Sequence, residues 1–165
     1  MSEIAEAASA TIVLSDFAAV DAVGKTNVIG AGVAMLGFEP QQGLTSRFTV
    51  WVEIWIPSNL CPAEFPVEVA FRDASGALVS LPGPTGLQPL RIAQVVTAER
   101  PSGLIPASSR DHIGSRVQMV FEFGNGLPVP FGANYSVQLQ IDGDSSRQWL
   151  YPFAVGGPPP GPVMG

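Results

Sequence analysis

One short stretch near the carboxyl end, residues 134–155, constrains the fold most. Alternate residues from Tyr135 to Ile141 are apolar, with Ser or Gln between them, which is the period of two expected for a strand with one buried face. The turn-forming run Asp-Gly-Asp-Ser occupies 142–145, and a second apolar stretch covers 149–155. Strand, tight turn and strand together predict a β-hairpin.

The same alternation recurs along the chain, separated mainly by segments rich in glycine and proline. The expected strands cover residues 11–14, 26–36, 48–56, 65–72, 77–81, 89–97 and 116–123, followed by the two strands of the hairpin. We expect the first two of these strands to pair with each other. Eight or nine short strands without a long helical pattern predict an all-β, antiparallel, immunoglobulin-like β-sandwich. A single cysteine rules out the paired cysteines of an antibody-type domain.

The 165 residues suit one domain, and composition places its ends. Residues 1–10 are small and acidic, which predicts an N-terminal arm. Residues 11–155 make up the sandwich domain. Residues 156–165, GGPPPGPVMG, predict an extended C-terminal tail of polyproline type.

Charge excludes one large class of function. The formal net charge is -6, and the eight cationic residues are one lysine and seven scattered arginines. Nucleic-acid binding requires clustered cations, so we expect no nucleic-acid partner.

Hydropathy bears on membranes and location. The mean hydropathy is +0.28, but charges and prolines interrupt every apolar run before it reaches the ~18 residues that a membrane span needs. The N-terminus lacks the basic region of a secretory signal. We therefore expect a location in a virion if the chain is phage-encoded, and otherwise in the cytoplasm.

Two tryptophans on one strand are the candidate partner or ligand surface. In residues 48–56, Trp51 and Trp55 point away from the alternating apolar residues of the same strand, about 13 Å apart. An exposed pair of indoles suits stacking on a sugar chain or packing against a protein. The alternative is burial beneath the protein's own loops or tail.

Candidate catalytic residues do not form a recognisable motif. Cys61 and His112 are a conceivable nucleophile and base, as are Ser108 or Ser109 with Asp111 and His112. The chain has no GxSxG elbow, and the serines with Asp111 are typical of a turn or helix cap. We therefore expect no enzymatic activity and no catalytic residue.

Cofactor and metal motifs are equally weak. The glycines at 24, 30, 32 and 37 do not have the GxGxxG spacing, and no parallel βαβ unit surrounds them. Asp142, Asp144 and Ser145 could supply oxygen ligands to calcium, but their spacing favours a turn. We expect neither a cofactor nor a metal.

Residues near both ends of the domain carry a resemblance to a family. The opening match is L-x-D-x-A followed by G-K-x-N-x-x-G, formed by Leu14, Asp16, Ala18, Gly24, Lys25, Asn27 and Gly30. The closing match is formed by Tyr135, Ile141, Asp142, Gly143, Phe153, Ala154 and Val155. Both resemble an uncharacterised family of short bacterial and actinophage all-β proteins. That family carries no known activity, and this chain departs from it in its proline-rich tail and its long 98–115 connection.

Low charge, apolar strand faces, terminal arms and this resemblance favour a non-enzymatic structural or interaction module. Its sharper form is a phage virion accessory protein, such as a capsid decoration or a minor capsid or tail component. The partner is then another protein, a capsid or tail subunit, or a second copy of the chain. The alternative is a carbohydrate- or small-ligand-binding β-sandwich module that uses Trp51 and Trp55.

Overall fold

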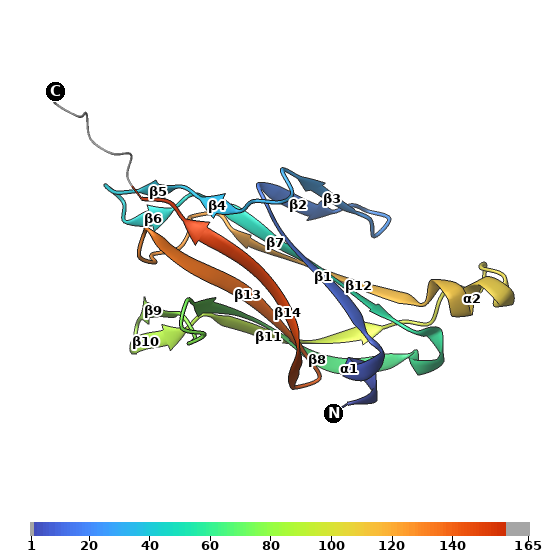
Figure 1. The fold of residues 1–165 in the computed structure, drawn as a ribbon. Coiled ribbons are helices and arrows are strands. Elements are labelled where there is room, and N and C mark those ends of the chain that lie inside the picture. Colours follow the sequence, from blue (N-terminus) through green and yellow to red (C-terminus); the bar gives the residue numbers. More distant parts are fainter. Residues whose placement is uncertain (1, 158–165) are drawn as a thin grey trace, which may run out of the picture.

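Two antiparallel sheets form the layers of a sandwich in the computed structural model, which describes residues 2–157 except the side chains of Ser145 and Gln148 (Figure 1). In order, the smaller sheet contains β1 (Ser9–Ser15), β7 (Phe48–Ile56) and β12 (Ser115–Phe123). The larger contains β11 (Arg91–Ala98), β8 (Ala63–Asp73), β13 (Ala133–Ile141), β14 (Asp144–Val155) and β4 (Met35–Leu36). The predicted all-β antiparallel sandwich is therefore confirmed. The pairing of β14 with β4 is parallel.

The core lies between these sheets, and β7 shows how alternation builds it. Its inward residues Phe48, Val50, Val52, Ile54 and Ile56 are each at most 1% exposed. The residues between them face outward, where Trp51, Glu53 and Trp55 are only partly buried. Burial of apolar side chains on one face is the main favourable contribution to folding, and it fixes which face of β7 turns inward.

An aromatic cluster closes one end of the core. The rings of Phe48 and Phe123 stack with their centroids 4.7 Å apart, and Phe71 meets Phe123 edge-on at 5.2 Å. Phe153 of β14 approaches both Phe48 and Phe71. The cluster therefore joins strands from both sheets by contacts that add to area burial.

The predicted closing hairpin is confirmed as β13 and β14. Ile141 pairs with Asp144 across a two-residue turn in which Asp142 has φ 52° and Gly143 has φ 74°. Two consecutive positive φ angles are the type I′ turn, whose twist matches that of antiparallel strands. Aspartate and glycine tolerate this conformation, so the Asp-Gly pair specifies the turn.

The chain after β1 departs from the sequence prediction. β1 pairs with β7 rather than with 26–36, and a separate hairpin forms from β2 (Phe17–Val20) and β3 (Thr26–Ile29). A four-residue strand offers too few alternating positions to stand out, so β2 was missed. Figure 1 shows this hairpin over the outer side of the three-stranded sheet.

The two ends of the chain are described to different extents. Residues predicted as an arm form α1 (Glu3–Ala7), in which Ala5 is 1% exposed, and they continue into β1. Arg147 of β14 donates to the carbonyls of Glu6 and Ala8, so this segment is bonded to the larger sheet. Of the predicted tail, residues 158–165 lie outside the described residues.

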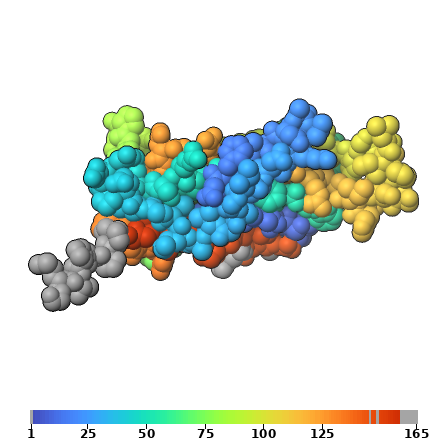
Figure 2. Space-filling model, turned by 90° about the horizontal axis from the view of Figure 1, so that it is seen from above, coloured from blue at the N-terminus to red at the C-terminus, as the bar shows by residue number. Residues whose placement is uncertain are grey.

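The remaining elements are short connections. They are β5 (Phe38–Glu39), β6 (Leu44–Thr45), the 3₁₀ turn η1 (Ser58–Leu60), β9 (Ser80–Gly83), β10 (Gly86–Pro89) and α2 (Ala107–Ile113). Such two- to four-residue strands explain why more strands form than the eight or nine expected. The connection between β11 and β12 carries α2 beyond one end of the sandwich, as the yellow segment in Figures 1 and 2 shows. Neither described helix is long and apolar enough to cross a membrane.

Candidate functional site

Two hollows flank α2 at the end of the sandwich. The first, which we call the Trp55 hollow, has a volume of about 420 Å³ and is lined by Ser9, Thr11, Glu53, Trp55, His112 and Arg116. The second, which we call the arginine pocket, has a volume of about 310 Å³ and is lined by Ser58, Asn59, Cys61, Arg100, Pro101, Arg110 and Asp111. Because α2 contributes residues to both, the long connection predicted from the sequence separates two different environments.

Strand register builds the floor of the Trp55 hollow. Trp55 lies between Ser9 of β1 and Arg116 of β12, and Glu53 lies between Thr11 and Gln118 in the next row. Residues that pair across strands project from the same face of a sheet. The outer face of the three-stranded sheet therefore presents an indole, a carboxylate and a guanidinium side by side.

The indole of Trp55 is held in one orientation. Its Nε1 donates a hydrogen bond of 2.6 Å to the carbonyl oxygen of Ile113, the last residue of α2. Gly114 follows with φ 64°, and a Cβ placed there would lie 2.5 Å from Trp55 Nε1 and 2.6 Å from the carbonyl oxygen of Ile56. Glycine is thus required both by the backbone conformation and by the close approach of α2 to the indole.

The charges of the Trp55 hollow compensate one another. Arg116 Nη1 lies 2.5 Å from Glu53 Oε1, and Gln118 Nε2 donates to the other carboxylate oxygen at 3.4 Å. Glu53 and Arg116 together give a formal charge of zero. The hollow therefore offers hydrogen-bonding groups without a net formal charge from this pair.

Trp51, the second candidate from the sequence, lies outside this hollow. It is half-buried between its strand neighbours Val13 and Val120, and β2 packs across β7 and β12 nearby. Its Nε1 is buried and has no hydrogen-bond partner in the described part of the chain. The two tryptophans therefore occupy different environments on the same face.

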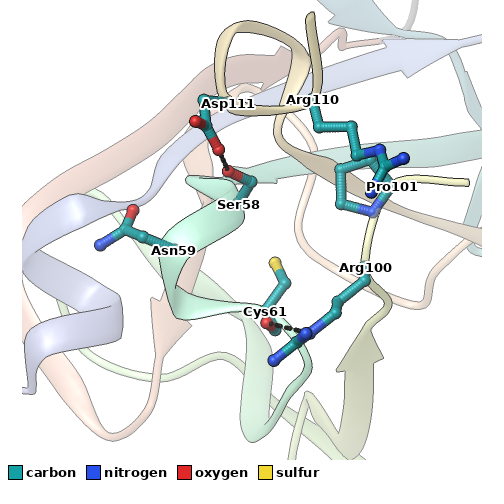
Figure 3. A pocket seen from close by; sticks show the side chains of 7 residues that line it. All are labelled: Ser58, Asn59, Cys61, Arg100, Pro101, Arg110 and Asp111. Atoms are coloured by element: carbon teal, nitrogen blue, oxygen red, sulfur yellow. Dashed lines mark hydrogen bonds between the residues drawn. The ribbon is translucent and has the colours of Figure 1, made fainter. Parts of the chain in front are cut away.

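The arginine pocket is built by three segments that meet beneath α2 (Figure 3). Ser58 of η1 donates a hydrogen bond of 2.6 Å to Asp111 Oδ1 of α2. Figure 3 shows Arg110 reaching down from α2 and Arg100 reaching in from the segment after β11. The Ser58–Asp111 bond ties the two sides of the pocket together.

Backbone carbonyls hold both arginines in place. Arg100 Nε donates to the carbonyl oxygen of Cys61 at 2.9 Å, and Arg110 Nε donates to that of Ile105 at 2.8 Å. Arg110 Nη2 also lies 3.4 Å from the carbonyl oxygen of Gly103. Within residues 2–157, no carboxylate oxygen lies within 4.0 Å of either guanidinium.

Cys61 and His112 lie in different hollows. Cys61 lines the arginine pocket, whereas His112 lines the Trp55 hollow on the other side of α2. Burial raises the pKa of the Cys61 thiol, against smaller opposing effects of a hydrogen bond with Ser115 and the charge of Arg100. A raised pKa keeps the thiol protonated near neutral pH, which makes it a poor nucleophile.

The serines and aspartates of the sequence motifs have structural positions. Ser108 and Ser109 lie inside α2, where Pro106 occupies the N-cap, so the predicted side-chain cap does not form. Asp111 instead bonds to Ser58. In the described residues, no group of three His, Cys, Asp or Glu side chains is arranged to hold a metal ion.

The β2–β3 hairpin presents a third candidate surface. Phe17 and Ile29 are paired across the strands and are 49% and 61% exposed, while Val20 and Val23 near the turn are 50% and 76% exposed. We call the Phe17–Ile29 pair the hairpin surface, because these two side chains share one face of the hairpin, whereas Val20 lies on the opposite face with the buried Ala18. In Figure 2 the hairpin, in blue, lies on the surface of the molecule that faces the viewer.

Residues of the family-like opening signature shape this hairpin. Gly30 has φ 67°, and a Cβ there would lie 2.1 Å from Asp16 Oδ2. Ala18 lies on the buried face of β2 and is 7% exposed, and Gly24 in the turn of the hairpin has φ 80°. Each of these positions therefore requires a small or turn-forming residue for a physical reason.

No local pattern in the sequence joins Arg100 and Arg110 to their pocket, so the sequence did not predict them as site residues. Arg100 and Arg110 meet Ser58 and Cys61 only through the tertiary packing of α2 against η1. Glu53 and Arg116 were recoverable in principle, since both face outward on predicted strands, but their pairing depends on β12 lying beside β7.

Fold and surfaces define an antiparallel β-sandwich protein with two polar hollows beside α2 and an exposed apolar hairpin. No family model matches the chain, and no curated protein matches it. Among solved structures, the chain is similar to the crystal structure of a β-glucosidase from Listeria innocua in complex with gluconolactone, with a TM-score of 0.43 and 12% identity. That match covers 91% of this chain and 16% of the β-glucosidase.

Proposed function

We propose that this protein is a non-enzymatic interaction module that binds a protein partner or a second copy of itself. The hairpin surface is the observation that carries the proposal. Phe17 and Ile29 lie side by side on one face of the hairpin and are 49% and 61% exposed, which is unfavourable in water. Exposed apolar groups gathered in one place mark interaction sites more often than isolated ones do.

Hydrogen bonds prepare the hairpin for binding. Asp21 Oδ1 accepts from the backbone N–H groups of Val23 and Lys25, both at 2.9 Å, which closes the turn. The hydroxyl of Thr26 donates to Gln118 Oε1, which fastens β3 to β12. A surface ordered before binding loses less conformational entropy when a partner docks.

The sharper form of the proposal is a virion accessory protein, a capsid decoration or a minor capsid or tail component. It rests on the opening signature, whose residues shape the same hairpin. A location in the virion belongs to this proposal. The cytoplasm is the expectation for a chain that is not phage-encoded.

A paired variant and its control test the interaction. We expect F17S/I29S to weaken self-association or particle binding at least tenfold, because the double substitution removes two apolar anchors. Leu104 is 96% exposed on a different loop, so L104S removes comparable apolar surface and should leave association unchanged. Sedimentation gives the mass in solution, and mass spectrometry of purified virions gives particle association. A wild-type chain that is strictly monomeric and absent from particles contradicts the proposal.

A second candidate function is binding of a neutral saccharide in the Trp55 hollow. The fixed indole can stack on the C–H face of a sugar ring, and the Glu53–Arg116 pair can hydrogen-bond to its hydroxyls. Ser9 and Thr11 line the same hollow. Its zero formal charge suits a neutral polyol.

An oligosaccharide array followed by calorimetry tests the saccharide proposal. W55A should abolish any binding that the array detects, W55F should retain part of it, and W51F should retain it fully because Trp51 lies outside the hollow. An array without binding removes this candidate and leaves the hairpin surface unaffected.

A further inference from the structure

We propose that the arginine pocket is a binding site for a small oxyanion, a carboxylate or phosphate group held by Arg100 and Arg110. Both guanidiniums line the same cavity, and Asp111 adds the one carboxylate among the lining residues, which leaves a formal charge of +1. This site lies apart from the hairpin surface and does not depend on the function proposed above.

The two guanidiniums are held in place, but some of their N–H groups have no hydrogen-bond partner in the described part of the chain. Each uses its Nε for a backbone carbonyl, which fixes the plane of the guanidinium. In the described part of the chain, the Nη groups of Arg100 and Nη1 of Arg110 donate no hydrogen bond. These groups remain available for the charge-assisted hydrogen bonds that arginine forms with carboxylate and phosphate oxygens.

Asp111 lines the arginine pocket but does not form an ion pair with either arginine. Its Oδ1 accepts from Ser58, and its carboxylate lies beyond 4.0 Å from both guanidiniums. Elsewhere in the described chain, Arg91 and Arg116 have carboxylate partners, Glu68 and Glu53. The arginine pocket thus concentrates positive charge in a protein whose formal net charge is -6.

The pocket also limits the ligand. Its volume of about 310 Å³ lies at the lower end of the range for small-molecule sites, about 300–1,000 Å³. Ser58 adds a hydroxyl group at the rim, whereas Figure 3 shows the Asn59 side chain directed away from the two arginines. Arg100 is exposed and Arg110 partly so, so water and salt screen the charges, and we expect a dissociation constant on the order of millimolar.

Titration of the whole chain with two probes tests the site. Sodium phosphate and sodium succinate are added separately at constant ionic strength, and the arginine Nε–H signals are followed by NMR. We expect saturable shifts at Arg100 and Arg110. Saturation by phosphate alone or by succinate alone assigns the preferred oxyanion, and either result supports the site.

Variants separate the pocket from the general charge of the protein. R100Q and R110Q should each weaken binding about tenfold, and R100K, which keeps the charge but loses the planar fork, should weaken it less. R91Q is the matched control, because Arg91 lies on β11 outside the pocket and pairs with Glu68. Unchanged amide spectra outside the pocket show that each variant is folded, and R100K provides the test at Arg100 if R100Q is not.

Two results overturn the proposal. One is the absence of saturable shifts with both probes up to 20-fold above the expected millimolar range. The other is an equal loss of binding in R91Q, R100Q and R110Q, which would mean that overall charge and not the pocket attracts the anion.

Discussion

The two hollows beside α2 use similar residues in opposite ways. In the Trp55 hollow, Arg116 is 2.5 Å from the carboxylate of Glu53, so a residue of the protein itself supplies the counter-charge of the guanidinium. In the arginine pocket, Arg100 and Arg110 bond to backbone carbonyls, which orient them without removing their charge. We propose a neutral polyol for the first and an anion for the second, although only the seven residues of α2 separate them.

The comparison shows that the group bonded to an arginine decides whether its positive charge remains available to a ligand. A carboxylate across the strand supplies both a hydrogen bond and a counter-charge. A peptide carbonyl supplies only the hydrogen bond. Four variants, ordered from the largest expected effect to the smallest, can break or sharpen this contrast.

G114A should have the largest effect, since it disturbs the junction that separates the hollows. The new Cβ would lie 2.5 Å from Trp55 Nε1, and φ 64° is strained for alanine. We expect a loss of about 2–3 kcal/mol in the free energy of unfolding, measured by urea denaturation. G103A is the control, because Gly103 lies in the same connection with open space around it. Equal effects of the two substitutions would contradict this account of the junction.

E53Q should make the formal charge of the Trp55 hollow resemble that of the arginine pocket. Arg116 loses its counter-charge, and the hollow then carries a formal charge of +1 in place of zero. We expect phosphate affinity at Arg116 to rise about tenfold over the wild type, detected by the same NMR titration. The effect on stability should stay below ~1 kcal/mol, because the Arg116 side chain is 54% exposed. No gain in affinity would show that the ion pair does not control selectivity.

The reactivity of Cys61 provides a pH-dependent comparison. Burial raises its pKa from 9.0, while the charge of Arg100 acts in the opposite direction. R100Q should therefore raise the pKa further and slow alkylation by iodoacetamide roughly twofold at pH 8, whereas R116Q should not. Rates measured from pH 7 to 10 give the result.

The sign of the accompanying stability change follows from the same pKa. A thiol with a raised folded-state pKa contributes stability that is fully present below its unfolded pKa and is lost as pH rises through its folded pKa. The stability of the wild type should therefore fall above about pH 9, and that of C61A should fall less.

S58A should have the smallest effect. It removes the 2.6 Å bond to Asp111 that ties η1 to α2, at an exposed position. We expect a loss of about 0.5 kcal/mol by urea denaturation, with the Trp55 signals of the other hollow unchanged. S109A is the matched control inside α2. A shift of the Trp55 indole resonance in S58A alone would show that the two hollows are coupled.

Sequence predicted the sandwich where strands were long and alternated strictly. β7 and the β13–β14 hairpin were recovered because five inward residues and an Asp-Gly turn mark them without ambiguity. The sequence did not predict β2, because its four residues contain too few alternating positions to form a recognisable pattern. Prediction thus failed where local pattern was short, and pairing was decided by which strand offered the better buried face.

The functional surfaces were less accessible to prediction than the fold. Trp55 was identified, but its separation from Trp51 depends on the hairpin that packs beside them. Arg100 and Arg110 lie ten residues apart, yet their shared pocket requires η1, which comes about forty residues earlier. A pocket assembled from three segments leaves no local spacing to recognise.

The position of β14 has a consequence for how the chain is made. This last strand lies between β13 and β4, and its Arg147 holds the segment that precedes β1. During synthesis, β4 and α1 must wait for β14, which lies far along the chain from both of them. Because segments distant in sequence pair late, their apolar faces need shielding until β14 has left the ribosome, and the emergence of β14 sets the moment at which the sandwich closes.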